Sequence, residues 1–359
     1  MTDYLSGERI QGSSTALAPN TSWKQIAKTT LGSGATAITV TGIPQKDNLW
    51  VLVSTLGQDA SLFINYGINT GSASTDTDDS DKWSWSGCYG GDATERTGVS
   101  QVKMKISDQQ NGYGVFGSLN IKNISDRQKF TTSRLGEYND TIGIPMSQDW
   151  VGKFNRTDGY IDRIELTSQL ATGDGSITFP AGSEVVVLGC DDDEADSGTN
   201  FWEELTDLEL TSAGSLDTGA SSIAEKKYLM FMIFQEDNGG TIDAEVNFNN
   251  DTGSFYGYNF KSGNRTGWST DDNNDKLYGF GSNQGGDKQG HAIFANISGK
   301  PKLGVFAATQ ASSAGSAGPR KRGVWKYSPS SLTDFISRIA VSGTSGIGST
   351  IRVWGGTPT

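Results

Sequence analysis

Short apolar runs separated by polar turns fill the whole chain, and several runs alternate strictly between apolar and polar residues. Residues 37–40 (Ala-Ile-Thr-Val) and 101–106 (Gln-Val-Lys-Met-Lys-Ile) are two such segments. Strict alternation places one face of a strand in a core and the other in solvent, as in two packed antiparallel sheets. The pattern therefore predicts an all-β fold.

A break in this pattern divides the chain near its middle. The apolar run 184–188 is typical of a strand that is buried on both faces, and the acidic cluster 191–194 follows it. Four adjacent carboxylates repel one another and stay in water. The chain restarts with Phe201-Trp202, so one core is predicted to end here and a second to begin.

The second half repeats the first. Trp23 and Leu31 align with Trp202 and Leu210, and further blocks follow in the same order. The matched blocks are 49–53 with 228–232, 64–72 with 246–254, 123–130 with 296–303, 151–154 with 324–327, 161–166 with 336–341 and 182–189 with 348–355. This order predicts the duplication of a whole domain, with a core in each copy.

Each copy carries about eight short apolar stretches, typical of an eight-stranded sandwich. We therefore predict two tandem jelly-roll-like β-sandwich domains from an internal duplication. The boundaries are 1–22 for an N-terminal arm, 23–190 for the first sandwich, 191–200 for an acidic linker and 201–359 for the second sandwich. Long polar segments such as 73–82 and 261–276 are expected to be loops.

The arm has too few apolar residues to form a core. Tyr4, Leu5 and Ile10 are its candidate anchors on a neighbouring subunit, and a frayed tail is the alternative.

Composition and charge remove several classes of function. A net charge of −12 opposes binding to nucleic acid, which needs clustered Lys and Arg. The longest apolar run, 229–234, is too short to span a bilayer, and residues 1–8 have no features of a secretory signal.

Candidate catalytic groups are sparse, and we expect no enzyme. His291 is the single histidine, so a catalytic triad or a histidine metal site would depend on it alone. The 41 acidic residues leave a two-carboxylate glycosidase open, although chance pairs are common at this number. Cys88 and Cys190 match no metal motif and are expected to be free thiols, with a disulfide as the alternative.

Two Asp-rich segments at comparable places in the copies are weak candidates for Ca²⁺, because hard oxygen ligands suit this ion. Neither has EF-hand spacing, and solvated loops are the alternative. The candidate ligands are Asp76, Asp78, Asp79, Asp81, Asp271, Asp272 and Asp275.

Clustered aromatic residues are candidates for glycan binding, because exposed Trp and Tyr rings can stack on sugars. Trp83, Trp85, Tyr256 and Trp268 are the candidates, and burial in a sandwich is the alternative. The basic run Arg320-Lys321-Arg322 is expected at an exposed loop tip, either contacting an acidic patch such as 191–194 on a neighbouring copy or simply solvated.

The segments 4–12 (Tyr-Leu-Ser-Gly-Glu-Arg-Ile-Gln-Gly), 182–189, 200–205 and 248–253 resemble a group of tandem-repeat virion structural proteins. These come from viruses of marine microbes, including viruses of ammonia-oxidising archaea. The resemblance covers most of the chain, but its motifs are strand and turn residues and carry over no catalytic role.

The resemblance implies a structural component of a virus particle. Our leading hypothesis is a homo-oligomeric virion protein, placed as a decoration, spike or fibre-like element with loops that contact host glycans. Its expected partners are other copies of itself and other virion proteins. A double jelly-roll major capsid protein is the rival within this class. A carbohydrate-binding module and an extracellular filament subunit are rivals from other classes.

Overall fold

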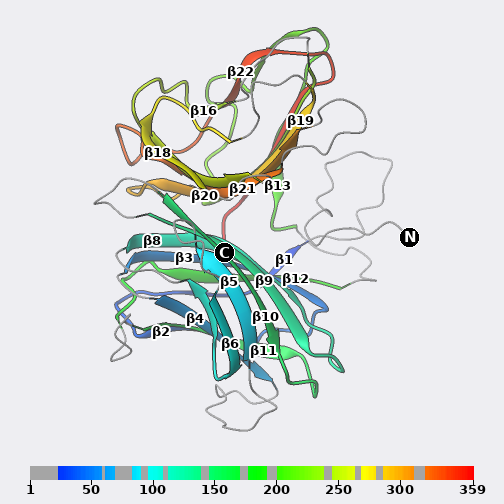
Figure 1. Cartoon of the computed structure of the whole chain (residues 1–359), viewed down its shortest axis with the longest axis vertical. Coiled ribbons are helices and arrows are strands. Elements are labelled where there is room, and N and C mark those ends of the chain that lie inside the picture. The colour runs from blue at the N-terminus through cyan, green and yellow to red at the C-terminus, as the bar shows by residue number, and fades with distance from the viewer. Residues whose placement is uncertain are drawn as a thin grey trace. The chain divides into compact units, whose positions relative to one another are not determined.

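The fold is all-β, and the computed structural model shows no helix among the described residues (Figure 1). It therefore offers no helix in these residues that could span a membrane. The described residues are 23–58, 61–68, 83–89, 96–107, 112–138, 145–169, 177–191, 200–237, 245–262, 268–279, 286–310 and 320–359.

The chain divides into two compact units. The first contains most of the described residues up to Trp202, and the second contains Glu203–Thr357. Each unit has two antiparallel sheets with a hydrophobic core of its own.

The first sandwich has an eight-stranded and a four-stranded sheet. The large sheet has the order β1 (Lys24–Thr30), β12 (Glu184–Cys190), β3 (Asn48–Gln58), β8 (Gly112–Lys122), β9 (Lys129–Tyr138), β10 (Pro145–Phe154), β5 (Trp83–Tyr89) and β6 (Arg96–Gln101). The small sheet has the order β2 (Ala37–Thr41), β11 (Ile161–Gln169), β4 (Ser61–Ile68) and β7 (Met104–Ser107).

The second sandwich repeats this plan with an eight-stranded and a three-stranded sheet. Its large sheet has the order β13 (Glu203–Glu209), β23 (Thr350–Gly356), β15 (Tyr228–Gln235), β19 (Lys288–Ala295), β20 (Lys302–Gln310), β21 (Arg320–Tyr327), β17 (Tyr256–Ser262) and β18 (Trp268–Asn274). Its small sheet has the order β14 (Gly214–Asp217), β22 (Ile339–Ser345) and β16 (Val246–Phe248).

Alternating side chains build each core. In β2 the residues Ile38 and Val40 are buried, whereas Ala37 and Thr39 are half-buried and Thr41 is exposed, as their alternation predicts. They pack with Val51 of the large sheet and Ile164 of the small sheet in one cluster. Full burial of such a side chain contributes about 1.5–3 kcal/mol, so the cores account for the two-layer arrangement.

The expectation of eight strands per copy is wrong, because in the described residues the two copies have twelve and eleven. The additional strands include edge strands with little apolar character, such as β1, β6 and β18, which the apolar pattern does not reveal. The expected loop at 261–276 is for the same reason largely strand, since it contains the end of β17 and all of β18.

The alternating segment 101–106 is not one strand. The large-sheet strand β6 ends at Gln101, and β7 begins at Met104 in the small sheet. Ser100 has a φ of 55°, and Val102 is 53 % exposed. The chain thus leaves one sheet and enters the other within a segment whose alternation resembles a continuous strand.

The duplication recurs at the level of individual hydrogen bonds. The Asn123 amide donates to Lys46 O at 2.9 Å, and its Oδ1 accepts from Ile161 N at 2.9 Å. Asn296 repeats both bonds, donating to Lys226 O at 3.2 Å and accepting from Ile336 N at 2.9 Å. An amide with both ends used in this way ties a hairpin to a neighbouring strand in each copy.

A fully buried lysine follows each of these amides. Lys129 donates to the carbonyls of Ile124 and Arg127. Lys302 donates to Ile297 O at 2.7 Å, Lys300 O at 3.0 Å and Leu332 O at 2.9 Å. Burial lowers the pKa of both ammonium groups, that of Lys302 to about 8. The carbonyl ring offsets part of this desolvation, because it supplies oxygen acceptors in place of water.

Three aromatic rings also occupy corresponding places in the two cores. In the first core, Tyr66 lies 4.7 Å from Trp83 and 5.8 Å from Phe154, measured between ring centroids. In the second, the corresponding rings are Phe248, Tyr256 and Tyr327, and the latter two stack at 4.9 Å. The copies therefore share their internal contacts as well as their strand order.

One block of the predicted repeat alignment is out of register by one residue. Leu49 pairs with Gly189, and Leu229 pairs with Gly355, so Leu49 corresponds to Leu229 and not to Tyr228. The strand around Leu49 is apolar on both faces. It therefore lacks the alternation that would fix the register from sequence.

The start predicted for the second sandwich, residue 201, also needs correction. Phe201 N donates to Trp23 O at 2.8 Å, and the Trp202 ring lies 5.5 Å from that of Trp50. Both residues belong to the first unit, and the second begins at Glu203. The alignment with Trp23 placed Trp202 in the second sandwich, whereas its ring packs on Trp50 of the first.

An ion pair joins β14 to the residue before β22, and it predicts an acid-sensitive second sandwich. Arg338 Nε donates to Asp217 Oδ1 at 2.8 Å, and its Nη2 donates to Oδ2. This arginine holds the pKa of Asp217 below its usual range. A carboxyl with a lowered folded-state pKa stabilises the fold above its unfolded pKa, and this contribution is lost as pH falls below about 4.

We expect Asp217→Asn to lower the free energy of unfolding of the second sandwich by about 1–2 kcal/mol at pH 7. The difference from the wild type should shrink as pH falls from 4 toward 2, as measured by urea unfolding at each pH. A constant difference over this range would contradict the assignment. Asp207→Asn, at a more exposed pair with Arg352, is the matched control and should have a smaller effect.

Candidate functional site

Two of the predicted glycan-binding aromatics are core residues, so the prediction is wrong for them. Trp83 is 0 % exposed and Tyr256 is 1 % exposed. The Trp83 indole donates to Asn65 Oδ1 at 3.3 Å, and the Tyr256 hydroxyl donates to Phe248 O at 2.9 Å. Their polar atoms bond within the sandwich, and neither ring is available to stack on a sugar.

Trp85 is half-buried, so its ring is only partly accessible. It lies two residues after Trp83 on β5 and therefore points to the same side of the sheet. Its ring packs edge to face on Trp150 at 5.5 Å. Trp268 begins β18, and its side chain lies outside the described residues.

The calcium candidates are only partly within the described residues. Asp76, Asp78, Asp79 and Asp81 lie outside them, as does the side chain of Asp272. Asp271 is exposed on β18, and Asp275 is exposed just after it. In the part of the chain that is described, no group of three His, Cys, Asp or Glu side chains is placed to hold a metal. Calcium binding stays a prediction.

The basic run is part of a strand and not a loop tip. Arg320, Lys321 and Arg322 begin β21, where backbone pairing to β20 fixes all three. Lys321 Nζ lies 5.5 Å from the centroid of the Phe260 ring. The charge of this segment predicted a solvated loop, but backbone hydrogen bonds hold it in the sheet. The acidic residue Asp191, proposed as its contact on another copy, pairs with Lys46 at 2.8 Å.

The remaining predicted groups are separate from one another. His291 is exposed on β19. Cys88 on β5 is half-buried, Cys190 at the end of β12 is buried, and no disulfide joins them, which confirms the expectation of free thiols. The arm candidates Tyr4, Leu5 and Ile10 lie outside the described residues.

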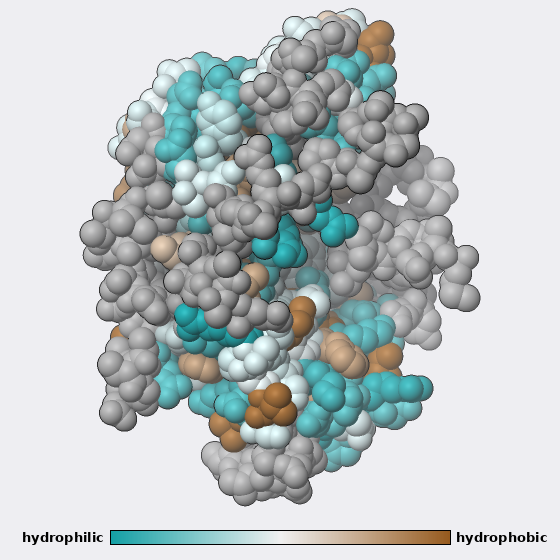
Figure 2. Space-filling view, viewed as in Figure 1, coloured by the Kyte–Doolittle hydropathy of each residue, from teal (hydrophilic) through white to brown (hydrophobic). Residues whose placement is uncertain are grey.

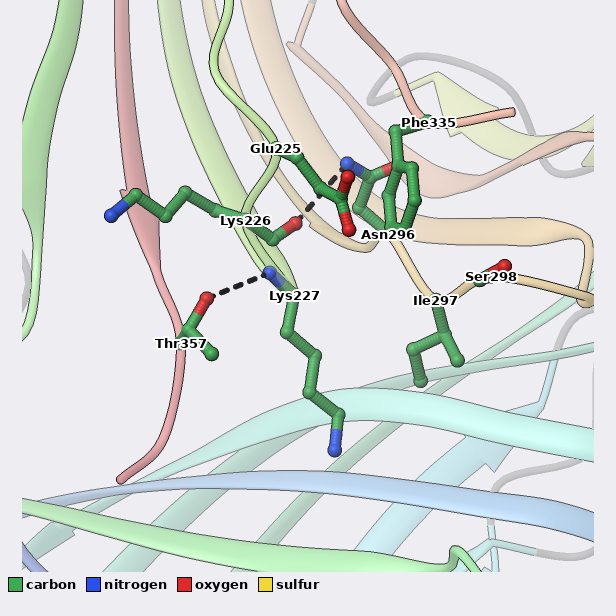
Figure 3. A pocket seen from close by; sticks show the side chains of 8 residues that line it. All are labelled: Glu225, Lys226, Lys227, Asn296, Ile297, Ser298, Phe335 and Thr357. Carbon is green, nitrogen blue, oxygen red and sulfur yellow. Dashed lines mark hydrogen bonds between the residues drawn. The ribbon is translucent and has the colours of Figure 1, made fainter. Parts of the chain in front are cut away.

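A hollow of about 220 Å³ lies at one end of the second sandwich, and we call it the corner hollow (Figure 3). It forms where the segment before β15, the turn after β19, the segment before β22 and the end of the chain after β23 meet. The residues that line it are Glu225, Lys226, Lys227, Asn296, Ile297, Ser298, Phe335 and Thr357.

Hydrogen bonds fix the frame of the corner hollow. Asn296 bridges two segments, as described above, and Lys227 N donates to Thr357 Oγ1 at 3.2 Å. Behind the Phe335 ring, Lys302 Nζ lies 5.6 Å from its centroid. The ring is thus held by the buried ammonium that organises the adjacent turn.

The corner hollow is lined by apolar side chains, Phe335 and Ile297, together with polar ones. Figure 3 shows the Glu225 carboxylate beside the Phe335 ring, whereas the Lys226 side chain runs away from that ring. Lys226 instead forms an ion pair with Glu203. Glu225 and Ser298 are exposed, and Phe335 is half-buried, so a carboxylate, a hydroxyl and an aromatic ring are accessible from solvent.

An ion pair joins two segments at the equivalent corner of the first sandwich. Asp191 Oδ1 accepts from Asp47 N at 3.0 Å, the bond that corresponds to Lys227 N with Thr357, and its Oδ2 pairs with Lys46. Thr357 is shorter and uncharged, so it cannot hold Lys226 in this way. Strand β13 also carries Glu203 where β1 carries Lys24, which gives Lys226 its alternative partner.

The corner hollow could have been found in the sequence from differences between the two copies, and not from what they share. Aligned positions that differ in charge between the copies, such as Asp191 with Thr357 and Lys24 with Glu203, mark this corner. Phe335 itself sits beside Ile336 at the place of Tyr160 beside Ile161, and its aromatic character alone does not distinguish it.

Hydrophobic residues are scattered on the part of the surface that Figure 2 shows. On the face shown in Figure 2, brown side chains occur as separate spots among teal and white ones. The large hydrophobic side chains that are exposed in the described residues are Val99, Val102, Phe130, Val151, Met232, Leu332 and Ile347. Single exposed apolar residues are ordinary on protein surfaces.

Comparisons with known proteins add little. No protein-family model matches the chain, and no curated protein matches it. A solved structure of the mouse laminin alpha1 chain, domains LG4-5, is 11 % identical over 92 % of this chain and 89 % of that chain, with a TM-score of 0.21. A likeness at this TM-score carries no argument.

Proposed function

We propose that the chain is a homo-oligomeric structural protein of a virus particle, placed on its surface as a decoration, spike or fibre-like element. The observation that carries the proposal is that the features shared by the two copies are scaffold features. The duplicated amides, buried lysines and aromatic triads hold strands together. Such duplication supports a building component more than a catalyst.

Two further features support this proposal. The sequence resembles virion structural proteins over most of its length, and its net charge of −12 disfavours nucleic-acid binding inside a particle. The candidate catalytic groups do not converge, since His291 is exposed on β19, apart from the other candidates, and the described residues contain no metal-binding cluster.

The test is the location of the chain in intact particles. Gold-labelled antibody against the purified chain should mark particles at regular surface sites in electron microscopy, and light scattering should show a defined oligomer. A chain that stays monomeric at high concentration and labels no particle would overturn the proposal.

A double jelly-roll major capsid protein is the second candidate, because two tandem sandwiches also suit a shell subunit. Copy number separates the two roles. Label that covers the entire particle, with density for this chain in a continuous shell, would favour the capsid role over surface decoration.

A further inference from the structure

We propose that the corner hollow binds a single neutral pyranose ring of a glycan. This proposal rests on the proposed surface role only for its biological setting, since binding is a property of the chain alone. It also relocates the expected glycan site from Trp83 and Tyr256, which are buried, to Phe335.

The groups around the corner hollow match the two faces of a sugar. The Phe335 ring offers an apolar surface on which the C–H face of a pyranose can stack, and the ammonium of Lys302 holds the ring in place. The carboxylate of Glu225 accepts hydrogen bonds from hydroxyl groups, and Ser298 both donates and accepts. One aromatic ring with polar groups at its edge favours a polyhydroxylated ring over a purely apolar ligand.

The charge and the size of the corner hollow limit the classes of ligand that it can bind. The Glu225 carboxylate lies beside Phe335 (Figure 3) and repels an anion placed on that ring. Of the two lysines that line the corner hollow, Lys226 pairs with Glu203, and the Lys227 side chain runs away from Phe335. This arrangement favours a neutral sugar over a phosphate or an acidic sugar. A volume of about 220 Å³ is below the roughly 300–1,000 Å³ of sites that enclose drug-sized ligands, so one ring fits and a long chain does not.

Binding of one ring in a shallow site is weak, on the order of millimolar. In a homo-oligomeric particle many such sites act together, and avidity can exceed the single-site affinity by about 10²–10⁴. Weak individual contact is therefore compatible with firm attachment of a particle to a polysaccharide surface.

The first sandwich supplies a matched control. Tyr160 occupies the place of Phe335, at the corner where Lys46 pairs with Asp191. Tyr160→Ala thus removes a comparable ring without touching the corner hollow. Thr357→Asp introduces the carboxylate of the first copy into the second, where it should accept from Lys227 N and obstruct the site.

The experiment is saturation-transfer NMR on the full-length chain with methyl glucoside, methyl galactoside, methyl mannoside and N-acetylglucosamine, and with inorganic phosphate as the anionic competitor. At least one sugar should bind, with protons of one ring face receiving most saturation. Phe335→Ala and Thr357→Asp should each weaken binding by at least about fivefold, whereas Tyr160→Ala should not. Glu225→Gln, an exposed and conservative change, should weaken it less.

The proposal is overturned if none of the sugars binds, if Phe335→Ala and Thr357→Asp leave binding intact, or if phosphate displaces the sugar. If Phe335→Ala does not fold, Thr357→Asp and Glu225→Gln still test the same site. These outcomes are read on the isolated chain. They are therefore separate from antibody labelling of particles, on which the structural role depends.

Discussion

Replacing Trp83 by alanine should destabilise the first sandwich by about 4 kcal/mol, because the change empties a large volume in the centre of a core. The Trp83 ring is fully buried against Tyr66 and Phe154, at centroid distances of 4.7 and 5.1 Å. Its loss also leaves Asn65 without the indole donor. Urea unfolding followed by circular dichroism measures the effect.

Two controls separate this effect from general damage. Trp83→Phe keeps most of the packed volume and should cost less than half as much. Val99→Ala, at a side chain that is 71 % exposed, should change stability by no more than about 0.5 kcal/mol. A Trp83→Ala protein with wild-type stability would show that this ring is not part of the core. Glycan binding by Trp83, as expected from the sequence, would then be supported again.

Replacing Lys302 by alanine should destabilise the second sandwich by about 3 kcal/mol, because three main-chain carbonyls lose their donor inside the protein. The acceptors are Ile297, Lys300 and Leu332. They belong to the turn after β19 and to the segment before Phe335, so the loss should also loosen the corner hollow. Scanning calorimetry should show a lower transition temperature for the second sandwich.

Lys302→Met tests whether donation or packing matters, since it keeps the length of the side chain and removes its N–H groups. It should be nearly as destabilising as alanine, and a fully stable methionine variant would contradict the role given to the ammonium. Lys300→Ala, at an exposed side chain in the same turn, should be neutral. Lys129→Ala should produce the corresponding loss in the first sandwich.

Much of the fold was predictable because duplication and alternation are both recorded in the chain. Alternating residues such as Ile38 and Val40 face the core as expected, and Asn123 with Asn296 mark equivalent corners. Polar edge strands such as β18 were not predictable, because backbone pairing forms them without an apolar face. The predicted alignment around Leu49 was wrong by one residue, because both faces of that strand are apolar.

The candidate site was much less predictable. Aromatic residues such as Trp83 were assigned to the surface by their polar neighbours, yet the spacing of two between Trp83 and Trp85 already places both rings on one side of the sheet. The corner hollow depends on four segments far apart in sequence. Only the folded chain brings Glu225 next to Phe335.

The exchange of Asp191 for Thr357 shows what a doubled scaffold permits. In one half the Asp191 carboxylate pairs with Lys46, whereas the other half has Thr357 at that place and its Lys226 pairs with Glu203. In a protein with a single sandwich, a new binding site at this corner would cost the ion pair that stabilises it. With a spare half present, selection can vary one corner while its twin remains conservative, so recognition is expected to evolve asymmetrically.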